Sequence, residues 1–241
     1  MEEEVKNLRD FILNTKSLMV LTGAGISKDS GIPTFRGEDG LWRNYDATKL
    51  ATPEAFKENP KLVWEWYNWR RSIILKAVPN YAHFAIKRLE DMIEDFLLVT
   101  QNVDNLHRDA GSKKLIEMHG NIFETLCTGC GYLKFEKCIF REDELPPRCE
   151  RCNSLLRPNV VWFTEPIPRD VLKKIFESID TKEAILVVGT SLLVYPAASL
   201  PFIFKEKNKK VFEINPEDTD ISYFADISIR GKAKEVFEKI I

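Results

Sequence analysis

Four of the five cysteines occur in two Cys-x2-Cys pairs, a spacing that can hold a metal ion. Cys127 and Cys130 form the first pair, Cys149 and Cys152 form the second, and residues 131–148 separate them. Such pairs present four thiolates at the corners of a tetrahedron, as in a zinc ribbon. A pair of disulfides would need secretion, and a thioredoxin-like redox site would use only one pair. Because four thiolates leave no open position, we predict one structural zinc ion.

A glycine-rich segment at residues 23–37 is suited to binding phosphate, and it directly follows the apolar run 17–22. Glycines at the end of a strand let backbone N–H groups approach a phosphate without a Cβ in the way. A dinucleotide is therefore the first ligand to expect. The segment is not a dehydrogenase fingerprint, because Lys28 stands at the third glycine and no strand precedes the acidic Asp46.

Amide and carboxylate side chains at residues 101–107 follow another apolar run, and the chain has three histidines. We expect His83 to be a surface or helix-capping residue, and His107 to be exposed because charged residues flank it. His119 has apolar neighbours, and Gly120 beside it would let a ligand pass close to the backbone. An isolated histidine of this kind is more often a core or capping residue. The position of His119 between the amide-rich segment and the cysteines favours catalysis.

Strand-like and helical patterns alternate along the chain. The strand-like runs cover residues 18–22, 96–100, 184–189, 210–214 and 226–229. The helical patterns cover residues 3–14, 82–94, 169–179, 196–207 and 232–241. This alternation predicts an α/β fold with a parallel sheet that is covered on both faces. Two segments interrupt it, an aromatic helical one at 35–78 and the cysteine-bearing one at 122–157, so we expect a ligand cleft beside an inserted lobe.

The composition is that of a soluble globular protein rather than a membrane or nucleic-acid-binding protein. The chain of 241 residues is 44% hydrophobic and 30% charged, and its formal net charge is −2. This charge gives no reason to expect nucleic acid or an anionic membrane as the partner. The apolar run at 18–21 is too short for a signal peptide or a membrane span, so we expect a cytoplasmic protein.

A set of short motifs, taken together, resembles the sirtuins, which are NAD-dependent protein-lysine deacylases. The motifs are GAGIS at 23–27, GIPTFRG at 31–37, TQNVDNLH at 100–107, HG at 119–120, the two cysteine pairs, RPNVVWF at 157–163, GTS at 189–191, NPE at 215–217 and GKA at 231–233. The resemblance implies one catalytic domain over 1–241, with a Rossmann-like large lobe and a smaller inserted zinc-ribbon and helical lobe. The implied boundaries are 1–34, 79–121 and 158–241 for the large lobe, 35–78 for the helical insertion with the cofactor loop, and 122–157 for the zinc ribbon.

The resemblance also implies roles for individual residues. In the first loop the NAD-binding residues would be Gly23, Ala24, Gly25, Ser27, Pro33, Thr34, Phe35, Arg36 and Trp42. The nicotinamide ribose and carboxamide would be held by Gln101, Asn102, Val103 and Asp104. The phosphate and adenosine end would be bound by Gly189, Thr190, Ser191, Asn215, Pro216, Glu217 and Ala233. Small and amide residues at strand ends suit a diphosphate and sugar hydroxyls, although GTS and NPE alone would indicate only loop turns.

In the implied reaction, the acyl oxygen of a modified lysine attacks the anomeric carbon of the nicotinamide ribose, and nicotinamide leaves. His119 would be the general base for a ribose hydroxyl, in a catalytic set completed by Gln101, Asn102 and Asp104. Histidine suits this task because its unperturbed pKa of ~6.5 leaves much of it neutral at physiological pH. The implied products are nicotinamide, acyl-ADP-ribose and free lysine. The acyl-lysine peptide would bind at Val161, Trp162 and Phe163.

Tyr67 and Arg70 bear on the choice of acyl group, because residues three apart share one face of a helix. A phenol and a guanidinium on one apolar face can receive a carboxylate. Spacing alone would favour a core tyrosine beside a solvated arginine. The pair nevertheless resembles that of the sirtuin branch that removes succinyl and malonyl groups, and Ala47 and Trp162 match this branch too. We therefore predict a dicarboxylic acyl preference with residual deacetylation.

Thr164 departs from the family pattern, in which phenylalanine, glycine and glutamate follow the substrate strand. Family enzymes pair the substrate peptide with this segment as an extra strand. Threonine favours a strand, so we expect the pairing to survive with closer limits on approach.

Two other functions use the same motifs. One is ADP-ribosyl transfer to a protein side chain, and the other is a non-catalytic NAD-sensing module built on the zinc ribbon. Asn102 and His119 beside a peptide-binding segment argue against the non-catalytic module. The products separate the two enzymes, because a deacylase releases acyl-ADP-ribose whereas a transferase leaves a modified protein.

Overall fold

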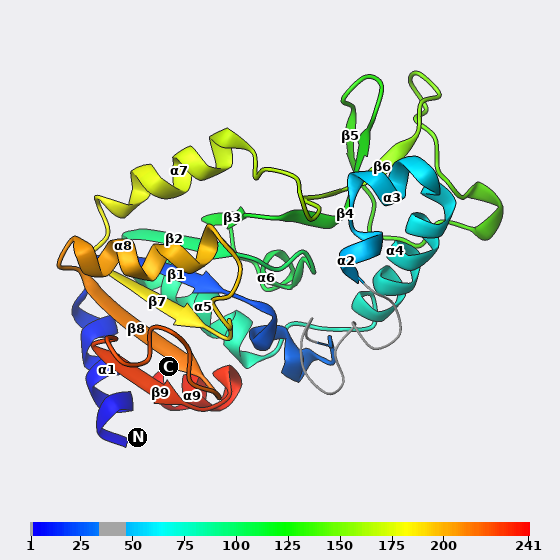
Figure 1. Ribbon diagram of the computed structural model, residues 1–241. Coiled ribbons are helices and arrows are strands. Elements are labelled where there is room, and N and C mark those ends of the chain that lie inside the picture. The colour runs from blue at the N-terminus through cyan, green and yellow to red at the C-terminus, as the bar shows by residue number, and fades with distance from the viewer. Residues whose placement is uncertain (1, 34–46) are drawn as a thin grey trace.

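A parallel sheet forms the larger part of the computed structural model, which describes residues 2–33 and 47–241 (Figure 1). Its strands are β1 (Ser17–Thr22), β2 (Asp95–Thr100), β3 (Leu115–Glu117), β7 (Ala184–Val188), β8 (Lys210–Asn215) and β9 (Ile227–Arg230). They lie in the order β3-β2-β1-β7-β8-β9, and every pairing is parallel. The chain leaves β1 in one direction along the sheet and later continues from β7 in the other. This reversal places a crevice at the carboxyl ends of β1 and β7.

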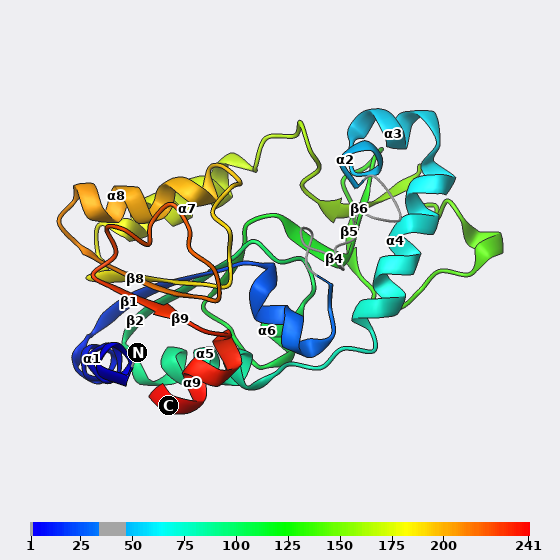
Figure 2. The ribbon, with the colours of Figure 1, turned by 60° about the horizontal axis from the view of Figure 1, so that its bottom comes forward.

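Helices cover both faces of this sheet (Figures 1 and 2). On one face lie α1 (Glu2–Asn14), α5 (Tyr81–Met92) and α9 (Ala233–Ile240), and on the other lie α7 (Arg169–Ile179) and α8 (Leu200–Glu206). Strand β1 contributes alternately to the two apolar cores, because successive side chains of a strand point to opposite faces. Leu18 and Val20 belong to the core with α1, α5 and α9, whereas Met19 and Leu21 belong to the core with α7 and α8.

The smaller lobe contains an antiparallel sheet in the order β5-β4-β6. Its strands are β4 (Gly120–Cys127), β5 (Leu133–Phe135) and β6 (Leu156–Val160), and the helices beside it are α2 (Ala47–Leu50), α3 (Pro53–Glu58) and α4 (Pro60–Ile74). Helix α4 begins where the Asn59 side chain accepts a hydrogen bond from the Leu62 N–H and Pro60 fills the first turn. Trp64 and Tyr67 of α4 and Phe123 of β4 are buried together in the core of this lobe.

The predicted α/β fold with an inserted lobe is confirmed, and the five predicted strands are present with ends shifted by one residue at most. Strand β3 was not predicted, because three residues are too few to show a pattern. The helix predicted over 196–207 is divided into a 3-10 turn, η4 (Ala197–Ser199), and α8, in whose first turn Pro201 lies. The remaining short helices are η1 (Ala24–Ser30), α6 (Leu106–Asp109) and η3 (Glu142–Glu144).

Among residues 2–33 and 47–241, no helix is both long enough and apolar enough to cross a lipid bilayer.

Candidate active site

Two glycine-containing loops cross at the carboxyl ends of β1 and β7. The Gly23 N–H donates to the Val188 carbonyl (3.1 Å), and the Gly25 N–H donates to the Gly189 carbonyl (2.8 Å). A Cβ on Gly25 would lie 2.7 Å from the Gly189 oxygen, and one on Gly189 would lie 2.6 Å from the Ile26 nitrogen. These glycines are therefore required by the mutual packing of the two loops, in addition to any contact with phosphate.

Ser27, Asn102 and Asp104 form a buried hydrogen-bond network directly beneath this crossing. Ser27 Oγ donates to Asp104 Oδ2 (2.7 Å), while Asn102 Nδ2 donates to Ser27 Oγ (3.2 Å) and to the Gly23 carbonyl (3.1 Å). Burial raises the pKa of the Asp104 carboxyl, although bonds from Ser27 and the Leu106 N–H oppose this. The three residues border a cavity of about 30 Å³, which Arg70 also lines. The network thus connects the loops after β1 and β2 around a small space.

His119 lies in the turn immediately before β4, with its ring directed at the loop after β2. Its Nδ1 is 3.1 Å from the Gln101 carbonyl oxygen, which can only accept, so Nδ1 carries the proton and Nε2 a free lone pair. Burial lowers the pKa of His119, and the bond to Gln101 only partly opposes it. The ring is therefore neutral near pH 7 and able to accept a proton at Nε2. Gln101 Nε2 also donates to Thr190 Oγ1 (3.0 Å), which connects the histidine to the loop after β7.

Gly120 has a different role from the one we expected. Its φ is +80°, and a Cβ there would lie 2.1 Å from the Asn159 carbonyl oxygen. The backbone of β6, rather than a ligand, occupies the space beside it. This glycine is therefore needed for the close pairing of β4 with β6.

The other two histidines are both buried, so the prediction that His107 is exposed was wrong. His83 does cap α5, since its Nδ1 accepts from the Asn80 N–H (3.2 Å), but it is not at the surface. The two rings lie 4.9 Å apart beneath the network, and His107 Nε2 is 3.0 Å from Thr22 Oγ1. Burial lowers the pKa of His83 to about 4 and that of His107 well below its usual value. The prediction was wrong because it relied on the charged neighbours of His107, whereas α6 directs the His107 side chain into the protein interior.

The structure brings together Tyr67, Arg70 and Trp162 from the predicted substrate site. Tyr67 Oη accepts a hydrogen bond from Trp162 Nε1 (2.9 Å), and both side chains are buried. The Arg70 guanidinium lies 5.6 Å from the Tyr67 ring centroid and 5.0 Å from that of Trp66. Burial lowers the pKa of Arg70, so this arginine is not the solvated residue that spacing alone would favour. Of the other two predicted peptide-binding residues, Phe163 is exposed and Val161 is half-buried.

Thr164 lies in a turn with a φ of +72°, so the expected strand conformation was wrong at this position. Strand β6 ends at Val160, and the predicted peptide-binding residues follow it outside any strand. A left-handed backbone suits the glycine of the family pattern and is unusual for a β-branched residue.

Of the residues predicted for the phosphate and adenosine end, 189–191 follow β7, Asn215 ends β8, and 216–217 continue into a loop. Two residues that were not predicted, Arg230 and Glu213, hold this loop. Arg230 donates to the carbonyl oxygens of Asn215 (3.1 Å) and Glu217 (3.0 Å). Its guanidinium also pairs with Glu213 (2.7 Å), which is fully buried in β8. The only signal for Glu213 in the sequence is a single acidic residue inside an apolar run. Ala233 is buried at the start of α9.

The predictions for Thr34, Phe35, Arg36 and Trp42 lie outside the described residues, and so does the side chain of Ala47.

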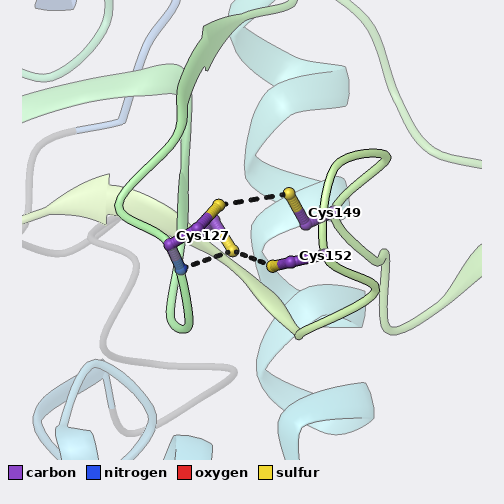
Figure 3. Close-up of side chains that lie close together, drawn as sticks. Cys127, Cys149 and Cys152 are labelled. Carbon is purple, nitrogen blue, oxygen red and sulfur yellow. Dashed lines mark hydrogen bonds between the residues drawn. The ribbon is translucent and has the colours of Figure 1, made fainter.

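The four cysteines of the two pairs face one another across the small lobe (Figure 3). All four sulfur atoms lie within 4.8 Å of one another, with Cys127 3.4 Å from Cys152 and Cys130 3.8 Å from Cys149. A tetrahedral zinc site with Zn–S bonds of about 2.3 Å has sulfur–sulfur distances of about 3.8 Å. Backbone N–H groups also approach the sulfurs, as that of Arg151 does at 3.4 Å from Cys149 Sγ. The donor set therefore fits one structural zinc ion, and the sulfurs are too far apart for disulfides.

Comparison with known proteins agrees with this arrangement of a parallel sheet, a crossing of glycine loops and a cysteine quartet. The profile of the Sir2 family matches residues 23–196. The chain belongs to the Sir2 family. NAD-dependent protein deacylases from Pyrococcus abyssi and Pyrococcus furiosus are 52% and 54% identical to it, over 95% and 94% of this chain and 94% and 93% of theirs. The sirtuin resemblance is thus confirmed, without distinguishing the succinyl and malonyl branch.

Solved Sir2 structures share the fold. A Sir2 homologue in complex with NAD superposes with a TM-score of 0.91 at 45% identity, covering 98% of this chain and 91% of that one. A Sir2 complex with a p53 peptide and NAD superposes with a TM-score of 0.87 at 33% identity, covering 98% and 96%. The shared fold therefore includes proteins whose structures contain both NAD and a peptide.

Proposed function

We propose that this Sir2-family protein is an NAD-dependent protein-lysine deacylase that forms nicotinamide, acyl-ADP-ribose and free lysine. The observation that carries the proposal is the bond between His119 Nδ1 and the Gln101 carbonyl. It leaves Nε2 as a proton acceptor at the edge of the crevice, between the loops that follow β1, β2 and β7. Related chains are NAD-dependent protein deacylases, which supports the same reaction here.

NAD, as the co-substrate, would lie along the carboxyl ends of the central strands. The Ser27–Asn102–Asp104 network would shape the nicotinamide end, and Gln101 would orient His119 for the ribose hydroxyl. The loops at 189–191 and 215–217 would hold the diphosphate and the adenosine, with Ala233 at the adenine. The roles of Thr34, Phe35, Arg36 and Trp42 stay predictions.

We propose further that Tyr67 and Arg70 accept the carboxylate of a succinyl- or malonyl-lysine. The Arg70 guanidinium is buried and borders the cavity beside Asn102, so a ligand carboxylate there would meet a desolvated cation. The Tyr67 hydroxyl, which already accepts from Trp162, retains its own proton to donate. Burial raises the pKa of Tyr67, which keeps the phenol protonated.

The test is incubation with NAD and matched acetyl-, malonyl- and succinyl-lysine peptides, with nicotinamide and peptide mass measured together. We expect turnover of all three and the highest kcat/KM for a dicarboxylic peptide. Arg70→Met should lower succinyl kcat/KM by about a hundredfold, equivalent to ~3 kcal/mol for a charge-assisted bond pair, and spare deacetylation. Arg141→Met, on the exposed surface of the same lobe, is the matched control.

Unchanged succinyl turnover in Arg70→Met would refute the carboxylate site. Nicotinamide release with ADP-ribose attached to protein, and no loss of acyl mass, would indicate ADP-ribosyl transfer instead.

We also propose that the whole chain works as one catalytic domain with the lobe boundaries given above. Its net charge of −2 favours protein substrates over nucleic acid or an anionic membrane surface, and we propose the cytoplasm as its location.

A further inference from the structure

The turn at residues 161–165 follows β6 and contains the proposed peptide-binding residues 161–163, and its backbone N–H groups at 161, 162, 163 and 165 are hydrogen-bonded within the protein. The Val161 N–H donates to the His119 carbonyl, and the Phe163 N–H donates to that of Ala51, each at 2.9 Å. The Glu165 N–H closes the turn on the Trp162 carbonyl (3.1 Å). The turn thus connects the backbone of His119 to the segment between α2 and α3 of the helical insertion.

Arg157 and Glu165 form a bidentate ion pair that holds this turn in place. Arg157 Nη1 and Nη2 donate to Glu165 Oε1 (2.6 Å) and Oε2 (2.8 Å), and Nη2 also donates to the Val160 carbonyl (3.0 Å). Burial alone would raise the pKa of the Glu165 carboxyl, but bonds from Arg157 and the Trp162 N–H lower it. The side chains are 18% and 22% exposed, so the pair is largely shielded from solvent.

Trp162 transmits this restraint to the acyl site. Its N–H donates to Glu165 Oε2 (2.9 Å), and the Arg157 guanidinium lies over its ring at 3.5 Å from the centroid. The indole is therefore held from the backbone and from one face. On its far edge Nε1 donates to Tyr67 Oη (2.9 Å), so the position of the phenol depends on the position of the indole.

We propose that Arg157 and Glu165 are positioning residues that set peptide affinity and acyl-group choice through Trp162 and Tyr67. They would touch neither the acyl-lysine nor NAD. The acyl-choice part rests on the proposed dicarboxylate site at Tyr67 and Arg70, whereas the peptide-affinity part needs only deacylation.

Because the backbone of Thr164 is strained, the conformation of this turn depends more strongly on the Arg157–Glu165 ion pair. A threonine at a φ of +72° favours a different turn conformation, and the Arg157–Glu165 pair opposes that rearrangement. A glycine at position 164 would remove the strain, so the turn would need less restraint. Glu165→Gln should therefore have a smaller effect in a Thr164→Gly background.

The experiment uses the zinc-loaded full chain and the variants Glu165→Gln, Arg157→Met and Arg157→Lys. Glu144→Gln and Arg141→Met are matched controls, because Arg141 and Glu144 form an exposed pair (3.2 Å) on the same lobe. Peptide Kd is measured by calorimetry for acetyl- and succinyl-peptides, and kcat and KM are measured for peptide and for NAD. Zinc content and thermal midpoints are recorded for every variant.

We expect Glu165→Gln and Arg157→Met to raise peptide Kd and KM about tenfold, equivalent to ~1.4 kcal/mol, with NAD KM unchanged. The ratio of succinyl to acetyl kcat/KM should fall, and Arg157→Lys should recover part of the peptide affinity. Glu144→Gln and Arg141→Met should have the same peptide Kd, KM and succinyl-to-acetyl ratio as the parent protein.

Unchanged peptide Kd in folded, zinc-loaded Glu165→Gln would overturn the proposal. So would a parallel loss of kcat, NAD affinity and thermal midpoint, which is the result of a purely structural role. If Arg157→Met does not fold, the lysine variant decides in its place. If the parent leaves succinyl-peptide untouched, the dicarboxylate site fails, and the acetyl-peptide affinities still decide whether the ion pair positions the turn.

Discussion

Replacing Thr164 with glycine should stabilise the protein, because the backbone at this position favours glycine. Thr164 has a φ of +72°, and its side chain is exposed at the tip of the turn. For a non-glycine residue, the clash of Cβ with the backbone in the left-handed region costs about 1–2 kcal/mol. Glycine removes that clash and enlarges the conformational freedom of the unfolded chain, which offsets roughly 0.5–1 kcal/mol of the gain. The net increase in unfolding free energy should be about 0.5–1 kcal/mol.

Gly111→Ala is the opposite control, because it introduces a Cβ at a left-handed backbone position. Gly111 has a φ of +96°, and a Cβ there would meet only the Lys87 side chain, at 3.6 Å or more. Alanine should therefore add a backbone penalty without a steric clash, and lower the unfolding free energy by roughly 1 kcal/mol. Thr164→Ala keeps the Cβ and removes only the branch, so it should recover less stability than glycine does.

The assay is equilibrium urea unfolding at fixed zinc concentration, followed by fluorescence and by circular dichroism, with thermal scans as a second measure. For a chain of this size, 1 kcal/mol corresponds to a shift of about 2–4 °C in Tm. Thr164→Gly should shift Tm upward and Gly111→Ala downward. If Thr164→Gly unfolds at the same urea concentration as the parent while Gly111→Ala is destabilised, the strain argument at Thr164 is refuted.

Three further predictions concern the site. Because the His119 ring is protonated below its lowered pKa, deacylation should be lost as the pH falls through that pKa and should be constant above it. His119→Ala should abolish turnover but retain NAD binding, which calorimetry measures. Removing zinc with a chelator, or replacing Cys149 with serine, should unfold the small lobe, detected by zinc content and by lost protection from hydrogen exchange. Arg230→Met should raise NAD KM roughly fivefold through ~1 kcal/mol of lost hydrogen bonding and leave peptide KM unchanged in steady-state kinetics.

The sequence predicted the sheet and the metal site well because both depend on local patterns. Short apolar runs that alternate with helical patterns predict buried parallel strands, and two Cys-x2-Cys turns determine most of their own geometry. Burial of individual polar residues was predicted poorly. His107 is next to charged residues in the sequence, whereas α6 directs its ring towards the buried His83. Flanking residues carry no information about which direction a one-turn helix faces.

Glycines of the family motifs illustrate a second limit of reading function from sequence. Gly25, Gly189 and Gly120 each have a neighbouring backbone atom where a Cβ would lie, so protein packing alone would exclude larger residues there. A motif glycine is thus compatible with a ligand contact and with a tight crossing of chains, and only coordinates separate the two.

The same reasoning explains why Arg157 and Glu165 were not identified, although both lie in or beside a recognised motif. Eight residues of an extended chain span about 26 Å, so nothing in the sequence indicates that these two side chains meet. The pairing arises because β6 ends at Val160 and the chain folds back on itself through a left-handed residue. That reversal, rather than an extended strand, directs Trp162 towards Tyr67. Thr164 and the Arg157–Glu165 pair therefore determine the conformation of the same turn. A substitution of either should change the effect that the other has on peptide affinity.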